Sequence, residues 1–317
     1  MAAGSRKANG GMKLPSFFVV GAQKAGTSSL HDRLRNLPSV RLPALKETHF
    51  FSNDEQYARG VQWYLRQFPE ISPDSVLGEV APDYLFAPRA AGRIRELIAR
   101  PQLIFIFREP IERAYSNYLM SVRKGYEKLP FAEALVEEST RLEDENGRKF
   151  LSYFSRSLYV EQVERYLALF PKEDMLFLKF EDLVDKGHIG RQTFRELADF
   201  IGIRVKPDQE GELTKANPAS QPRSLLVRNL LYGSSSVKKL FRFLIPSRDL
   251  RAAIAHRVDL LNLKPASKSE IGAIPAAISR RARQEVSRLQ EMTGLGLEDW
   301  LGQIAAYDIE AKQTNSE

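Results

Sequence analysis

The feature that most constrains this chain is a strand-to-helix transition with two glycines, spanning residues 17–30. The segment reads Phe-Phe-Val-Val-Gly-Ala-Gln-Lys-Ala-Gly-Thr-Ser-Ser-Leu. Its apolar start, Phe17–Val20, predicts a buried strand, and the leucine spacing that follows predicts a helix through Leu37 with Thr27–Ser29 as capping residues. A tight loop that enters a helix turns unpaired backbone N–H groups toward one point, in front of the positive end of the helix dipole. The segment therefore predicts an anion site, most often one for phosphate.

The position of the lysine separates this loop from the ATP-binding loop, which reads Gly, four residues, Gly, Lys and then Ser or Thr. Gly21 and Gly26 have that spacing, but Thr27 occupies the lysine position and Lys24 lies inside the loop. We therefore expect the Lys24 ammonium to approach the terminal group of a nucleotide from another side, and a Ser/Thr ligand for magnesium is not assured. The structural alternative is a capped turn with one exposed lysine, because short glycine motifs have many false matches.

Composition narrows the class of protein and of partner. The 317 residues are 43% hydrophobic and 27% charged, as in soluble globular proteins. No apolar run approaches the ~20 residues of a membrane span, and residues 1–13 read as a disordered leader without the apolar core of a signal peptide. The absence of cysteine excludes disulfides and thiolate metal sites, and the four histidines show no metal-ligand spacing. We expect a cytoplasmic protein whose net charge of +7 favours anionic partners other than nucleic acid.

Strands and helices alternate along most of the chain. Buried strands are predicted at Phe17–Val20, Ser75–Val80, Gln102–Phe107 and Asp174–Phe180. Helices are predicted at 54–68, 88–100, 110–122, 131–138, 158–170 and 191–201, with a charged loop at 141–149. This alternation predicts an α/β fold with a mostly parallel sheet flanked by helices, in which ligands bind beyond the carboxyl ends of the strands. Gly21 and Arg108 each follow a strand, so both are expected at that edge.

The pattern changes after Asn217-Pro218. Residues 221–268 contain ten lysines and arginines against two aspartates, together with several apolar pairs. This composition predicts two or three basic amphipathic helices, as an insertion in the core or a cap over it. A helix within 274–300, broken at Gly294 and followed by a core-packed Trp300, closes the predicted domain 14–303. Residues 304–317 form the predicted C-terminal tail.

Four blocks of the sequence resemble the sulfotransferases that use 3′-phosphoadenosine 5′-phosphosulfate (PAPS), most closely the bacterial and heparan-sulfate-type glycan sulfotransferases. The loop is similar to the family's Gly-x-x-Lys-x-Gly-Thr-Ser/Thr-x-Leu, and Lys46-Glu47-x-His49-Phe50-Phe51 is similar to its Glu-x-His-Phe-Phe block. The third block, Glu79-x-x-Pro82-x-Tyr84, resembles the one leading into the acceptor cleft. The fourth, Arg108-Glu-Pro-x-x-Arg113-Ala-Tyr-Ser116, resembles the second nucleotide motif.

The resemblance implies a P-loop nucleotide-kinase-like fold and a reaction that consumes PAPS and releases PAP. The basic helical insertion predicted at 221–268 lies outside the part of the chain that the resemblance covers well. It places Phe180 against the adenine and Arg108 with Ser116 on the 3′-phosphate, for which a guanidinium fork is well suited. The nucleotide-binding residues that it implies are Gln23, Lys24, Ala25, Gly26, Thr27, Ser28, Ser29, Arg108, Ser116, Phe180 and Arg223. The acceptor-binding residues that it implies are Lys46, Phe50, Pro82 and Tyr84.

Sulfuryl transfer to a hydroxyl needs a base, because the acceptor loses a proton during the reaction. We assign this role to Glu47, with His49 as its partner or substitute, since residues two apart on an extended segment share a face. The structural alternative is a helix-capping Glu47 and a packed His49. Lys24 is expected to stabilise charge on the transferred group. No metal is expected to be required, because a sulfuryl group carries less charge than a γ-phosphate.

Two other functions stay open at this stage. A P-loop kinase or NTPase would need a lysine where Thr27 stands. A non-catalytic basic adaptor with a vestigial nucleotide pocket would use residues 221–268 on an anionic surface, and the same segment is a candidate for peripheral membrane contact. The acceptor is a small molecule, a saccharide or a lipid-linked compound, and the sequence does not choose among a sugar hydroxyl, a polyketide alcohol and an amine. The oligomeric state is open.

Overall fold

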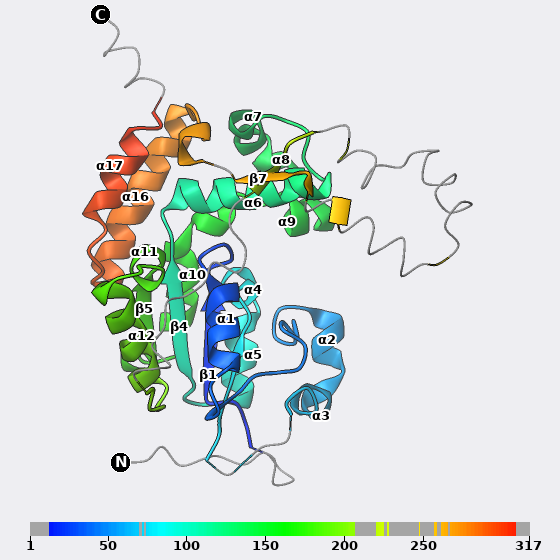
Figure 1. The fold of residues 1–317 in the computed structure, drawn as a ribbon, viewed down its shortest axis with the longest axis vertical. Helices are drawn as coiled ribbons and strands as arrows, with labels where there is room; N and C mark the ends of the chain where they lie inside the picture. Colours follow the sequence, from blue (N-terminus) through cyan, green and yellow to red (C-terminus); the bar gives the residue numbers. More distant parts are fainter. Residues whose placement is uncertain are drawn as a thin grey trace, which may run out of the picture. The chain divides into compact units, whose positions relative to one another are not determined.

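The computed structural model describes residues 13–69, 72, 74–206, 220–224, 227, 247, 257–258, 261–265 and 267–308 (Figure 1). The chain forms two compact units built from interleaved segments. The first unit comprises residues 1–109, 158–217 and 284–298, and the second comprises 110–157, 218–283 and 299–317. The domain limits 14–303 remain a prediction.

A five-stranded parallel sheet forms the centre of the first unit, with the spatial order β2-β3-β1-β4-β5. The strands are β1 (Phe17–Gly21), β2 (Val40–Arg41), β3 (Val76–Val80), β4 (Gln102–Phe107) and β5 (Met175–Lys179). Val19 of β1 lies opposite Val80 on one side and Ile104 on the other. All of β1 is buried, as expected of a strand in the middle of a parallel sheet that is covered on both faces. The predicted α/β fold is confirmed.

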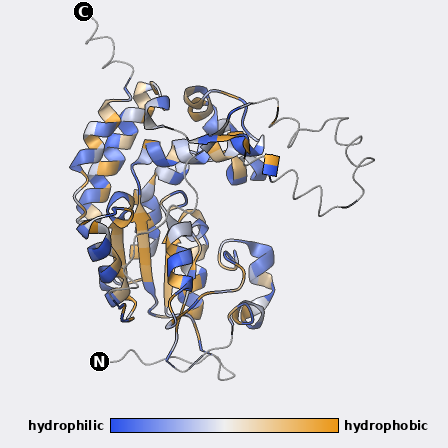
Figure 2. Ribbon diagram, viewed as in Figure 1, coloured by the Kyte–Doolittle hydropathy of each residue, from blue (hydrophilic) through white to orange (hydrophobic). Residues whose placement is uncertain are grey.

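Helices connect these strands and flank the sheet (Figure 1), and Figure 2 shows that hydrophobic residues concentrate on the strands. The core of the first unit therefore lies between the sheet and the apolar faces of its helices. These helices are α1 (Thr27–Arg35), α2 (Asp54–Ala58), α3 (Gly60–Leu65), α4 (Asp83–Phe86), α5 (Ala90–Leu97), α10 (Tyr159–Leu167), α11 (Phe180–Leu183) and α12 (His188–Phe200), with a 3₁₀ turn at Lys172–Asp174.

The second unit is organised by buried polar side chains. Its helices are α6 (Pro110–Lys124), α7 (Phe131–Val136), α8 (Glu138–Arg141), α9 (Glu145–Phe150) and most of α17 (Glu298–Ala305), with 3₁₀ turns at Ser155–Ser157 and Lys268–Glu270. Helix α16 (Ala276–Thr293) is divided between the two units. Glu138 accepts hydrogen bonds from the amides of Tyr153, Phe154 and Ser155. The buried Arg113 donates to the Ser157 hydroxyl and the Tyr153 carbonyl. Arg113 of the second nucleotide motif therefore supports its neighbours.

The two ends of the basic segment are paired with each other. Strand β6 (Ser220–Pro222) runs antiparallel to β7 (Leu263–Pro265). The basic helices predicted within 221–268 fall almost wholly outside the described residues. None of the described helices is long and apolar enough to cross a membrane.

The start of α1 differs from its prediction. Gly26 is the N-cap residue, with a φ of +78°, and no side chain caps the helix. Capping by Thr27–Ser29 is therefore wrong, because these residues already lie within the first turn. A glycine, which has no Cβ, adopts this left-handed conformation easily and lets the loop turn sharply into the helix.

Other element boundaries were also predicted imperfectly. The helix predicted over 54–68 is split into α2 and α3 at Gly60, whose φ is +79°. The charged loop 141–149 contains α9, where the Asp144 side chain accepts a hydrogen bond from the Gly147 amide. Phe180 begins α11 instead of ending a strand. The break at Gly294 and the burial of Trp300 are confirmed, and α17 carries regular structure past residue 303 with Ile304 buried.

We expect Gly78→Ala to destabilise the protein, because a Cβ atom on Gly78 would lie 2.2 Å from the ring of Phe17 in the adjacent strand. Overpacking of this kind costs about 1–3 kcal/mol of the free energy of unfolding. Gly92→Ala is the matched control: its Cβ would meet no other part of the protein within 4 Å, and alanine should stabilise α5 by about 1 kcal/mol. Urea denaturation measures both, and a Gly78→Ala protein as stable as wild type would contradict the packing of β1 on β3.

Candidate active site

The loop between β1 and α1 bends through two residues with left-handed backbone. Lys24 has a φ of +74° and Gly26 a φ of +78°. The Ala22 amide donates to the Ile106 carbonyl of β4 at 2.7 Å, and the Ala25 amide donates back to the Ala22 carbonyl at 3.1 Å. The loop is thus tied to the carboxyl edge of the sheet and curls in front of α1, whose first amides have no partner within the helix. This local geometry fits the predicted anion site.

Two residues from distant segments lie against this loop. Nη1 of Arg108, which follows β4, donates to the Lys24 carbonyl at 3.3 Å. The Arg108 guanidinium lies 4.8 Å from the centroid of the Phe180 ring, in a cation–π contact. The same ring borders Gly26, where an added Cβ would come within 3.0 Å of it. The structure therefore brings Lys24, Gly26, Arg108 and Phe180 together, with a flat ring and a cation beside an amide-lined loop.

The other predicted nucleotide residues divide between the two units. Ala25 and Thr27 are buried in the loop, and Gln23, Ser28 and Ser29 are half-buried beside them. Ser116 lies on α6 of the second unit. Arg223 also belongs to the second unit, where its Nε donates to the Leu263 carbonyl at 3.0 Å and braces the β6–β7 pair. The nucleotide contacts of Ser116 and Arg223 remain predictions.

The segment that carries the predicted base is attached to the loop helix. Nζ of Lys46 donates a 2.6 Å hydrogen bond to the hydroxyl of Ser28, the second residue of α1. Glu47 follows Lys46 directly in the chain. This bond makes Lys46 a link between base and loop, and its contact with an acceptor remains a prediction.

A buried carboxylate holds the next residue, Thr48. Glu79 of β3 is 0% exposed, and its Oε1 accepts hydrogen bonds from the Thr48 amide at 3.0 Å and the Thr48 hydroxyl at 2.7 Å. Its Oε2 accepts from the hydroxyls of Tyr64 at 2.9 Å and Tyr84 at 3.0 Å. Burial raises the pKa of Glu79, and the hydrogen bonds from these three residues oppose that rise.

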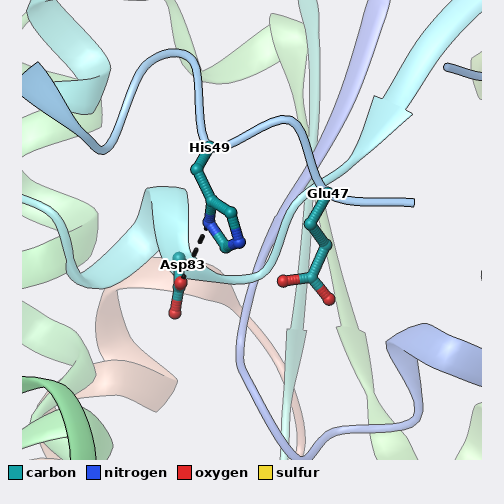
Figure 3. A group of neighbouring side chains, drawn as sticks. All are labelled: Glu47, His49 and Asp83. Carbon is teal, nitrogen blue, oxygen red and sulfur yellow. Dashed lines mark ion pairs between the residues drawn. The ribbon is translucent and has the colours of Figure 1, made fainter. Parts of the chain in front are cut away.

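Glu47 and His49 flank Thr48, and their side chains meet a third one, Asp83 (Figure 3). One donor atom from each lies within 4.8 Å of the other two, and His49 Nδ1 is 3.4 Å from Asp83 Oδ2. In Figure 3 the imidazole lies between the two carboxylates. The expected proximity of Glu47 and His49 is confirmed, but the extended backbone assumed for it is wrong, because His49 has a left-handed φ of +53°.

Asp83 is the site residue that the sequence prediction missed. It occupies an unassigned position of the block Glu79-x-x-Pro82-x-Tyr84 and begins α4. An acid in the turn after a predicted strand, at the edge where ligands bind, was the available signal. Its partnership with His49 was not readable, because two segments distant in sequence had to meet.

Proximity and burial shift the pKa values of this group. Burial raises the pKa of Glu47, and the nearby Asp83 carboxylate raises it further. The hydrogen bond to Asp83 raises the pKa of His49, against burial, which lowers it. A glutamate with a raised pKa is a stronger base at neutral pH, whereas a histidine with a raised pKa keeps its proton for longer. The pKa of both groups is therefore raised, for different reasons: burial acts first on Glu47, and the hydrogen bond to Asp83 acts first on His49.

Three residues predicted to contact the acceptor are packed inside the protein. Phe50 is 2% exposed and stacks on Tyr64 with ring centroids 4.6 Å apart. Tyr84 is 0% exposed and donates its hydroxyl to Glu79, and Pro82 is also buried. Phe50, Pro82 and Tyr84 are therefore part of the protein interior in this structure, and their contact with an acceptor remains a prediction.

Among the described residues, Glu47, His49 and Asp83 are the one group of three His, Asp or Glu donors close enough to share a metal ion. One imidazole nitrogen and two carboxylates are ligands that several divalent metals accept. The contact of His49 with Asp83 already engages two of these donors with each other. That no metal is required remains a prediction.

These features define an α/β protein with a nucleotide-type loop and a Glu–His–Asp group. Residues 14–242 match the family model of the sulfotransferase domain, and the chain belongs to this family. It is 32% identical to the Homo sapiens heparan sulfate glucosamine 3-O-sulfotransferase 5 over 165 residues, which are 51% of this chain and 46% of that protein. It is 30% identical to the Homo sapiens 3-O-sulfotransferase 6 over 233 residues, 68% of this chain and 63% of that protein.

The chain spans about half the length of most of the curated relatives it matches. Among solved structures, it is similar to a sulfotransferase from Alicyclobacillus acidocaldarius, with a TM-score of 0.61 and 24% identity. That likeness covers 90% of this chain and 98% of the other, and it supports the sulfotransferase fold.

We expect His49 and His31 to titrate on opposite sides of the ordinary histidine pKa of about 6.5. The Asp83 carboxylate raises the pKa of His49, whereas burial lowers that of His31. Asp83→Asn should lower the pKa of His49 and leave His31 unchanged, since His31 pairs with Asp32 instead. An NMR titration of the imidazole protons, assigned with single histidine substitutions, measures both. A His49 that titrates below 6.5 and ignores Asp83→Asn would contradict the described ion pair.

Proposed function

We propose that this protein is a PAPS-dependent sulfotransferase, which transfers a sulfuryl group to a hydroxyl or amine of a saccharide acceptor and releases PAP. The observation that carries the proposal is the hydrogen bond from Lys46 to Ser28, which attaches the segment bearing Glu47 to the helix of the nucleotide loop. Group transfer from a nucleotide needs a base held close to the nucleotide. Membership of the sulfotransferase family supports the same conclusion.

The loop and its neighbours fit such a nucleotide. Backbone amides of residues 26–28 would bind the 5′-phosphate in front of α1, whereas the Ala25 amide already donates to the Ala22 carbonyl. Arg108 would bind the 3′-phosphate, and the Phe180 ring, already against Arg108 and Gly26, would lie along the adenine. Bound PAPS supplies the sulfuryl group.

The residues of the base group then have separate roles. Glu47 takes the proton of the acceptor hydroxyl as the sulfuryl group passes to the acceptor oxygen. Lys24 stabilises negative charge on the transferred group. His49 holds its proton because Asp83 raises its pKa, so it orients Glu47 or the acceptor. Neutral His49 as the base is the second assignment, and the substitutions below separate the two.

The acceptor class is inferred from similarity and charge. The relatives named above are heparan sulfate glucosamine sulfotransferases, which supports a saccharide. The net charge of +7 favours an anionic one. A small-molecule or a lipid-linked acceptor is the alternative to a saccharide. For a lipid-linked acceptor, residues 221–268 would contact the membrane surface.

Nucleotide binding and transfer test the proposed function. PAP should raise the melting temperature, because a ligand that binds only the native state at 100 times its Kd stabilises by about 2.7 kcal/mol. We also expect transfer of labelled sulfate from PAPS to a heparan-type oligosaccharide, unchanged after treatment with a chelator. Stabilisation by ATP with magnesium alone would indicate a kinase, and stabilisation by neither nucleotide would indicate the adaptor. Loss of transfer in chelator, restored by one divalent cation, would contradict metal independence.

Lys24→Ala should reduce turnover far more than PAP affinity. Lys24 lies within the loop, and its ammonium is assigned to the transferred group, which PAP lacks. Donors that stabilise developing charge commonly account for roughly a hundredfold in rate. Single-turnover transfer and PAP calorimetry measure the two effects. Equal proportional losses would make Lys24 a binding residue.

Glu47→Gln should reduce turnover by about a hundredfold or more, because glutamine keeps the size of the side chain and cannot take the proton. PAP affinity should be unchanged, and His49→Ala should cost less. A Glu47→Gln enzyme that keeps most of its activity would exclude Glu47 as the base, and a larger loss in His49→Ala would assign that role to His49.

The pH profile provides an independent check on the same residue. A base works deprotonated, so kcat/KM should fall as the pH drops through the pKa of Glu47, above the ordinary value of about 4.3. His49→Ala should move this limb to still higher pH, because the charged imidazole lowers the pKa of Glu47. Lys46 also lowers that pKa, whereas burial, Asp83 and Glu79 raise it. If the fall of kcat/KM at low pH disappears in His49→Ala, His49 is the group that titrates.

A further inference from the structure

The buried Glu79 carboxylate is not explained by stability alone. Glu79 is fully buried in the sheet, where a charge loses its hydration. Replacing buried charged groups by apolar residues of similar volume often leaves stability unchanged or raises it. A carboxylate at this buried position therefore points to a task other than stability. The four donors on Glu79 are arranged unevenly: two tyrosines share Oε2, and both donors on Oε1 come from Thr48.

Thr48 lies between the two residues of the base group. Its amide is the link to Glu47, and the hydrogen bond of that amide to Glu79 fixes the plane of the Glu47–Thr48 peptide. Its hydroxyl donates to Glu79 and accepts a 3.1 Å hydrogen bond from the Phe50 amide. This second bond bridges residues 48 and 50, on either side of His49. Both neighbours of Thr48 therefore have their backbone directions set by contacts of Thr48.

His49 needs such a clamp because its backbone is strained. A φ of +53° is uncommon for a non-glycine residue and persists only where the surroundings enforce it. Besides the Thr48–Phe50 bridge, the His49 carbonyl accepts a 3.0 Å hydrogen bond from the Asn53 amide. The left-handed turn carries the imidazole to Asp83, four residues beyond Glu79 on the same chain segment. The end of β3 and its exit thus hold the base segment at two points.

We propose that Glu79 is a positioning residue for the base: through Oε1 it holds Thr48 so that Glu47 and His49 are set in the geometry used for proton removal. This inference rests on the proposed sulfotransferase function for its kinetic consequence. Its geometric part, that the Glu79–Thr48 bonds set the place of His49, concerns the structure alone. Glu79 itself is fully buried and is bonded to Thr48, Tyr64 and Tyr84.

Substitutions at Thr48 test this better than Glu79→Gln, which would turn an amide NH₂ toward donors in the core and risk misfolding. Thr48→Val removes the hydroxyl bonds and keeps the shape. Thr48→Ser restores the hydroxyl. Tyr64→Phe is the matched control, since it removes one hydrogen bond from the other oxygen of the same carboxylate. The measurements are kcat, KM for the acceptor, PAP affinity, melting temperature and the chemical shift of the His49 ring at fixed pH.

We expect Thr48→Val to lower kcat by roughly tenfold or more, because small misplacements of a reacting group have large effects on rate. Acceptor KM and PAP affinity should stay within about twofold, Thr48→Ser should recover most of the rate, and the His49 signal should move in Thr48→Val alone. Tyr64→Phe should lower the melting temperature but change kcat little. Equal kcat losses in Thr48→Val and Tyr64→Phe, or an unmoved His49 signal in Thr48→Val, would overturn the proposal.

A wild-type protein that transfers no sulfate would refute the proposed function, and the His49 signal would still decide the geometric part.

Discussion

The interaction on which the site depends is the hydrogen bonding of one buried carboxylate. Glu79 accepts from Thr48 through one oxygen and from Tyr64 and Tyr84 through the other. Because a buried carboxylate without hydrogen-bond partners is very costly, these four bonds offset its loss of hydration. They connect β3, the base segment, α3 and α4, and the rings of Phe50 and Phe51 pack beside the tyrosines.

The shape of the nucleotide loop is set mainly by its backbone conformation. Left-handed residues at 24 and 26 curl the loop, and the missing side chain of Gly26 lets the Phe180 ring lie against it. Arg108 then bridges the loop carbonyl and that ring. The hydrogen bond between Lys46 and Ser28 connects this loop with the base segment, so the parts needed for group transfer share one compact unit.

Charge in the base group is balanced within a small space. Two carboxylates lie near one imidazole, so the pKa values of Glu47 and His49 are linked: Asp83 raises both, and His49 lowers that of Glu47. Substitution of Asp83 therefore changes the pKa of both Glu47 and His49. This coupling explains why the pH profile and the histidine titration report on the same geometry.

Local patterns in the sequence determined much of this protein. The apolar runs identified four of the five strands of the main sheet and missed the two-residue β2. The Gly21-to-Gly26 spacing identified the loop, because such patterns depend on neighbours in the chain. Glu47 and His49 were found as a pair from a six-residue block. Tertiary structure decided what each neighbouring side chain meets. Asp83 became the partner of His49 only when the exit of β3 reached residue 49, and the burial of Phe50 and Tyr84 was likewise set by packing between distant segments. Burial and long-range hydrogen bonds depend on which distant segments pack together, and no local pattern around Thr48 or Glu79 records that pairing.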